Sequence, residues 1–94
     1  MSTTKFATKA LHTGHDTTKT AGTRAVPIFQ TSSYVFNNSE HASNLFSLSA
    51  AGFIYTRLNN PTNDILEQRL AALEGGIGAV VTASGTAAIA TTLL

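Results

Sequence analysis

The chain has 94 residues, of which 43% are hydrophobic and 12% charged, and its formal net charge is +1. This content is too apolar for a disordered tail, and the length suits one small domain or part of a larger one. The absence of cysteine excludes disulfides and thiolate metal sites. No basic run indicates a nucleic acid or a membrane surface, and no apolar stretch is long enough for a membrane span or a secretory signal. We therefore expect a cytoplasmic protein with neither nucleic-acid nor membrane partners.

The first half of the chain predicts two short helices and one strand, joined by polar segments. Residues 1–33 are rich in Thr, Ser and Lys and show little hydrophobic periodicity. The predicted elements are a helix over 5–13 ended by Gly14, an extended arm over 15–26, a short strand over 34–36, and a helix over 40–50 that Ser39 caps and Gly52 ends.

A third helix is the clearest prediction, and it begins at Asn60-Pro61. Asparagine can cap the first amides, and proline suits the first helical position because its missing N–H would be unpaired there. The helix should end at Gly75-Gly76. Its apolar face is formed by residues at i, i+4 and i+7, with one neighbour beside them: Leu66, Leu70, Leu73 and Ile65.

The segment after that helix predicts a strand and a fourth helix. Ala79 to Ala83 is typical of a buried parallel strand, and Ser84-Gly85 begins a helix that continues to Leu94. One buried strand cannot form a sheet, and a parallel neighbour requires a crossover of a dozen or more residues. We therefore expect an α/β fold truncated after its first core strand and helix.

Two motifs are candidate phosphate sites. At Ser84-Gly85-Thr86, a strand–turn–helix junction presents free backbone N–H groups at the positive end of a helix. Taken alone, an ordinary Ser-Gly helix start explains this motif as well. In the second motif, Tyr55 and Arg57 project to the same side if the backbone is extended, so that a phenol and a guanidinium can close on one phosphate. A surface arginine beside a half-buried tyrosine is the alternative.

Three other motifs give weaker evidence for a functional site. Gly76-Ile77-Gly78 lacks the third glycine of a dinucleotide fingerprint and precedes its strand. His12 and His15 could bind a metal only with further ligands, so we expect no metal site. Ser84 has no G-x-S-x-G context that would indicate a nucleophile.

The motifs together resemble the start of the Cys/Met-metabolism family of pyridoxal-phosphate (PLP) enzymes. The resemblance covers nearly the whole chain, and within the family the residue pattern is most like that of the O-acetylhomoserine sulfhydrylases. One departure is Thr86, where many relatives have Met. The residues that carry the resemblance are Tyr55-Thr56-Arg57, Asn59-Asn60-Pro61-Thr62, Leu73-Glu74-Gly75-Gly76 and Ala83-Ser84-Gly85-Thr86-Ala87-Ala88-Ile89, with Thr8, His12, Gly14, Val26-Pro27-Ile28 and Gln30-Thr31-Ser32 before them.

The resemblance implies a fold-type I (aspartate aminotransferase-like) PLP transferase. Residues 1–59 would form an N-terminal arm and inter-subunit segment, and residues 60–94 the start of the PLP-binding domain. It implies a homo-oligomer, a dimer of dimers, in which Tyr55 and Arg57 reach the neighbouring subunit's cofactor. The implied cofactor-binding residues are Tyr55, Thr56, Arg57, Ser84, Gly85 and Thr86.

The implied reaction makes homocysteine from O-acetylhomoserine and sulfide or a thiol. PLP acts as an electron sink while acetate leaves the γ carbon. The Schiff-base lysine would lie beyond Leu94, so we expect no catalytic residue within these 94 and no activity from them alone. The alternatives are a methionine γ-lyase or a cystathionine synthase or lyase of the same family and, in another class, a free-standing anion-binding or dimerisation module.

Overall fold

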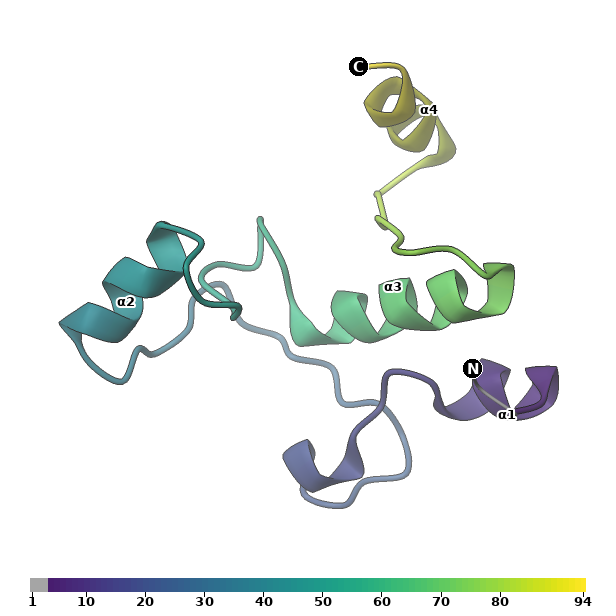
Figure 1. The fold of residues 1–94 in the computed structure, drawn as a ribbon, viewed down its shortest axis with the longest axis horizontal. Coiled ribbons are helices and arrows are strands. Elements are labelled where there is room, and N and C mark those ends of the chain that lie inside the picture. The colour runs from purple at the N-terminus through teal and green to yellow at the C-terminus, as the bar shows by residue number, and fades with distance from the viewer. Residues whose placement is uncertain (1–3) are drawn as a thin grey trace.

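A computed structural model describes residues 4–94, and regular structure in that range is helical (Figure 1). Helix α1 packs against α3, whereas α2 and α4 lie on other sides of the molecule. The elements in chain order are α1 (Phe6–His12), the 3-10 helix η1 (Thr17–Lys19), α2 (Ser39–Phe46), α3 (Pro61–Glu74) and α4 (Gly85–Leu93).

Both predicted strands are wrong for the described residues. The nearest feature to the strand expected over 34–36 is an isolated antiparallel bridge between Ser33 and Tyr55. Residues 79–83 form no ladder, and the N–H of Val81 donates to the Glu67 carboxylate instead (2.9 Å). A strand needs a neighbouring strand to pair with, and residues 4–94 provide none for this segment.

The N-terminal arm follows the prediction closely at α1, which begins and ends within one residue of it. Gly14 follows the helix with a φ of 87°, and a Cβ there would lie 3.1 Å from the Ile65 carbonyl oxygen. Glycine therefore allows both the turn and the close approach of the arm to α3. The predicted extended arm is interrupted by η1, whose cap Asp16 accepts a hydrogen bond from the Thr18 N–H.

Helix α2 differs from its prediction at both ends. Its N-cap is Asn38, whose side chain accepts from the His41 N–H (2.7 Å), and the chain leaves the helix after Phe46 through a left-handed Leu48 (φ 64°). Gly52 does not end the helix; it passes over Leu45, where a Cβ would lie 2.7 Å from the leucine Cδ2.

Helix α3 confirms its predicted bounds. The Asn60 side chain caps the Thr62 N–H, Pro61 is the first residue, and Gly75 ends the helix with a φ of 70°. The predicted apolar face is only partly covered, since Ile65 is buried but Leu66 and Leu70 are 45% and 43% exposed. Within the described range the buried side chains are Leu45, Ile65 and the polar Asn60.

The coil after α3 runs back above that helix before α4 begins, and α4 stands clear of the rest (Figure 1). Helix α4 begins at Ser84-Gly85 as predicted, and Ser84 caps it, its hydroxyl accepting from the Ala87 N–H (3.1 Å). The helix exposes large apolar side chains, among them Ile89 (63%) and Leu93 (80%). None of the helices in residues 4–94 is long and apolar enough to cross a membrane.

Candidate functional site

Tyr55 and Arg57 lie together as the sequence predicts. The guanidinium carbon of Arg57 lies 4.9 Å from the centroid of the Tyr55 ring, which is the geometry of a cation–π contact. The backbone, however, is a turn rather than an extended segment, because the N–H groups of Leu58 and Asn59 both donate to the Tyr55 carbonyl (2.9 and 3.1 Å). The stacking contact, not strand alternation, holds the two side chains on one side.

A shallow, open hollow of about 530 Å³ lies beside this pair. Arg57 forms no ion pair within residues 4–94, and no carboxylate lines the hollow, so the guanidinium charge is available to an anion. The lining residues are Phe29, Gln30, Thr31, Ser32, Tyr55, Thr56 and Arg57.

Thr56, between the stacked residues, is held by the segment that precedes α2. Its hydroxyl donates to the carbonyl oxygen of Thr31 and lies 3.1 Å from the Tyr34 hydroxyl and 3.2 Å from the Asn60 amide nitrogen. Its N–H donates to the Ser32 carbonyl (2.8 Å). Thr56 thus joins the turn that carries Tyr55 and Arg57 to the segment that forms the other wall of the hollow.

Asn60 and Thr62 also bond to the segment that precedes α2. The sequence predicted Asn60 only as a helix cap and did not predict these bonds. The Asn60 amide donates to the Phe29 carbonyl (2.9 Å), and the Thr62 hydroxyl donates to the Pro27 carbonyl (2.8 Å) while accepting from the Phe29 N–H (2.9 Å). The available signal was the unused half of the capping side chain. An asparagine that caps with its oxygen still has two N–H donors that need acceptors.

Ser84, Gly85 and Thr86 lie at the exposed N-terminus of α4. The N–H groups of Gly85 and Thr86 have no acceptor within residues 4–94, and a Cβ at Gly85 would meet no atom within 4 Å. Since the Ser84 hydroxyl accepts from Ala87, its own hydrogen remains free to donate. Donors directed at open space from a helix N-terminus fit a phosphate group.

The hollow beside Tyr55 does not include the start of α4. The residues lining the hollow beside Tyr55 come from segments 29–32 and 55–57, and none of Ser84, Gly85 and Thr86 is among them. The segment that leads into α4 is attached to α3 through the hydrogen bond from Val81 to Glu67. A single described chain therefore presents two separate sets of donors.

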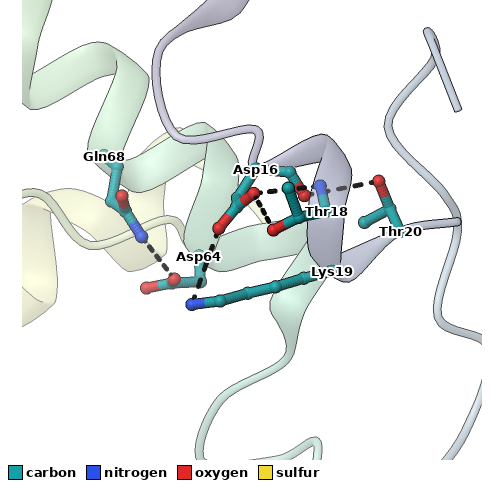
Figure 2. Close-up of polar contacts among 6 residues, drawn as sticks. All are labelled: Asp16, Thr18, Lys19, Thr20, Asp64 and Gln68. Carbon is teal, nitrogen blue, oxygen red and sulfur yellow. Dashed lines mark hydrogen bonds and ion pairs between the residues drawn. The ribbon is translucent and has the colours of Figure 1, made fainter. Parts of the chain in front are cut away.

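A second hollow, of about 380 Å³, lies between the arm and α3 and was not predicted. Asp16 on its wall accepts from the Thr18 hydroxyl (2.6 Å) and N–H (3.0 Å) and lies 3.9 Å from the Lys19 ammonium (Figure 2). The Thr18 hydroxyl and N–H lower the pKa of Asp16 from its usual value by bonding the charged form. Across the hollow, the Gln68 amide donates to Asp64 (2.5 Å). Both carboxylates on the wall of the hollow therefore have a hydrogen-bond donor from a nearby side chain.

The histidines give no metal site in the described range, where no group of three His, Cys, Asp or Glu side chains comes together. His15 Nε2 lies 3.0 Å from the Thr20 hydroxyl, and His41 Nδ1 accepts from the Asn37 N–H (3.1 Å). His12 is exposed at the end of α1.

Comparison with known proteins identifies relatives for nearly the whole chain. Residues 7–94 match the family described as Cys/Met metabolism PLP-dependent enzyme. The O-acetyl-L-homoserine sulfhydrylase of Leptospira meyeri is 56% identical over 84 residues, which are 89% of this chain and 19% of that protein. The L-methionine gamma-lyase of Fusobacterium nucleatum is 49% identical over 96 residues, covering 99% of this chain and 24% of that protein.

The fold is similar to that of a solved structure from Campylobacter jejuni, described as an O-acetylhomoserine (thiol)-lyase with N'-pyridoxyl-lysine-5'-monophosphate. The TM-score is 0.91 at 42% identity, and the match covers 96% of this chain and 22% of that one. The described helices thus correspond to the N-terminal part of such enzymes. The chain spans about a fifth of the length of the relatives it matches.

Proposed function

Since this chain belongs to the Cys/Met metabolism family of PLP-dependent enzymes, we propose that it is the N-terminal portion of an O-acetylhomoserine sulfhydrylase. The complete enzyme would make homocysteine from O-acetylhomoserine and sulfide by γ-replacement. The observation that carries this choice within the family is the 56% identity to the Leptospira meyeri sulfhydrylase. The 49% identity to a methionine gamma-lyase favours γ-elimination as the second candidate reaction.

The residues present fit the phosphate of PLP. Gly85 and Thr86 would donate backbone N–H bonds to the cofactor phosphate of their own subunit, and the Ser84 hydroxyl has a hydrogen free to join them. The support is that the two N–H groups have no acceptor within residues 4–94. A threonine at position 86 contributes through its backbone, so a different side chain there leaves this contact intact.

Tyr55 and Arg57 would hold the phosphate of the neighbouring subunit's cofactor. In support, the Arg57 charge has no carboxylate partner in the described chain, and the hollow beside the pair includes no residue of the α4 N-terminus. A phosphate bound at both sites of one chain would need the two sets of donors in one place. We therefore infer a dimeric active site, in an enzyme built as a dimer of dimers.

PLP would supply the electron sink that allows protons to leave the α and β carbons of the substrate. Within this part of the chain, Arg57 and the α4 N-terminus would supply the positive field that holds the phosphate dianion. The division into an arm over 1–59 and the start of the cofactor domain over 60–94 is part of the same proposal. So are a cytoplasmic location and the inactivity of residues 1–94 alone.

The test is product analysis with the natural chain that contains these residues. With O-acetylhomoserine and PLP, addition of sulfide should yield homocysteine and acetate in equal amounts. Without sulfide, little 2-oxobutanoate should form. If 2-oxobutanoate and ammonia form at the same rate whether or not sulfide is present, the enzyme is a γ-lyase. If the protein freed of its cofactor forms product at the same rate with and without added PLP, the cofactor assignment is wrong.

A further inference from the structure

We propose that Thr56 is a positioning residue that fixes the Tyr55–Arg57 pair for phosphate binding, rather than a phosphate ligand itself. This inference rests on the function proposed above, because it concerns how that pair meets the cofactor phosphate. Thr56 lies between the two residues in sequence, yet its polar atoms bond to segment 31–34 and to Asn60.

The Thr56 hydroxyl has no bonding capacity left for a phosphate. A hydroxyl has one hydrogen to donate and two lone pairs that accept. Its hydrogen goes to the carbonyl oxygen of Thr31, which can only accept. The Tyr34 hydroxyl at 3.1 Å and the Asn60 amide nitrogen at 3.2 Å must therefore be the donors in their contacts with Thr56. Binding a phosphate through this hydroxyl would break the bond to Thr31.

Asn60 connects this hydroxyl to the start of α3. Its side chain is 5% exposed, and its oxygen accepts from the Thr62 N–H (2.9 Å). Its amide nitrogen donates to Thr56 and to the Phe29 carbonyl (2.9 Å), so both N–H groups have acceptors. Three chain segments (27–34, 55–57 and 60–62) thus meet through the Thr56 hydroxyl and the Asn60 amide.

The direction of Arg57 depends on this junction. Within residues 4–94 its guanidinium forms no hydrogen bond or ion pair and lies over the Tyr55 ring, and its side chain is exposed. A side chain held by stacking alone takes its direction from the backbone that carries it. That backbone is fixed by the Thr56 N–H to Ser32, by the Thr56 hydroxyl to Thr31, and by the turn that closes on the Tyr55 carbonyl. Loss of the Thr56 hydroxyl should therefore weaken phosphate binding by Tyr55 and Arg57.

The experiment compares PLP with pyridoxal, which lacks the phosphate, on the natural chain freed of its cofactor. The dissociation constant of pyridoxal divided by that of PLP measures the contribution of the phosphate group alone. Thr56→Val keeps the shape of the side chain without the hydroxyl, and we expect the ratio to fall about ten-fold. Thr56→Ser keeps the hydroxyl and should restore the ratio. Thr18→Val, which removes an exposed hydroxyl bonded to Asp16, is the matched control and should leave the ratio unchanged.

Each other outcome has a definite meaning. If Thr56→Val weakens PLP and pyridoxal equally or changes neither, or if Thr56→Ser does not restore the ratio, Thr56 is not a positioning residue. Tyr34→Phe separates a positioning residue from a phosphate ligand, and it also replaces Thr56→Val if that variant does not fold. It leaves the Thr56 hydroxyl in place, removes one donor to it and keeps the ring against Phe53 (centroids 5.7 Å apart), so the ratio should fall a few-fold. An unchanged ratio would contradict positioning through this hydroxyl. A ratio near one in the unsubstituted protein would instead refute the proposed phosphate site.

Discussion

Replacing Gly14 by alanine should destabilise the docking of the N-terminal arm on α3. The backbone there has a φ of 87°, and a Cβ would lie 3.1 Å from the Ile65 carbonyl oxygen and 3.3 Å from the Gln68 Cβ. A left-handed conformation costs a residue with a Cβ about 1–2 kcal/mol. Forcing a methyl group against a fixed helix backbone adds roughly 1–3 kcal/mol. We therefore expect a loss of about 2–5 kcal/mol for Gly14→Ala.

Gly22→Ala separates the two contributions, because Gly22 also has a positive φ (74°) but a Cβ there would meet nothing within 4 Å. This substitution should lower the free energy of unfolding by the backbone cost only, about 1–2 kcal/mol. The assay is urea unfolding of the natural chain, with hydrogen exchange of the α1 amides reporting the arm directly. Equal losses from the two substitutions would refute the argument that the arm and α3 are too close for a side chain at position 14.

Three further predictions concern single side chains, and a fourth concerns the fragment. Glu67→Gln should weaken the bond to the Val81 N–H by about 1 kcal/mol, because the acceptor loses its charge; faster hydrogen exchange at Val81 would show it, and unchanged exchange would contradict it. The pKa of Asp16 is lowered, so its contribution to stability is present above about pH 4 and is lost as the pH falls through the folded pKa; in an NMR titration, Thr18→Ala should raise that pKa, and no rise would contradict the cause given. Arg57→Lys should weaken PLP binding about ten-fold without affecting pyridoxal, since an ammonium cannot make the paired bonds of a guanidinium; equal weakening of both ligands would count against the phosphate role. Residues 1–94 alone should show neither a cooperative melt nor turnover, and either observation would contradict the view that they are an incomplete domain.

The sequence predicts best those features that depend on neighbouring residues. The cap at Asn60, the proline after it and the left-handed Gly75 set the bounds of α3, and Ser84 sets the start of α4. These signals are local because a capping side chain and the N–H that it accepts are two or three residues apart. For the same reason the helix start at Gly85 could be predicted from the amino-acid sequence alone, whereas phosphate binding there stays a prediction.

Features that depend on distant contacts were predicted poorly. The expected strand over 79–83 has the right composition, but its N–H at Val81 is bonded to a side chain 14 residues earlier. Helix α2 was predicted to end four residues too late, because nothing local marks the left-handed Leu48. The contacts from Asn60 to Phe29 and from Thr56 to Thr31 were missed because each joins segments 25 or more residues apart. Composition cannot select one partner among many at that separation.

The exposed area of the chain bears on the missing strand over 79–83. A folded monomer of 9.8 kDa should expose about 5,200 Å². This chain exposes 7,481 Å², about 2,300 Å² more, which is the scale of an obligate interface. The excess includes Val80 within the unpaired segment 79–83, and Ile89 and Leu93 on α4. Val80 lies where a buried strand was expected. The sequence pattern there is consistent with a larger α/β domain. In such a domain, other protein surface would pair with residues 79–83 and cover the apolar side chains of α4.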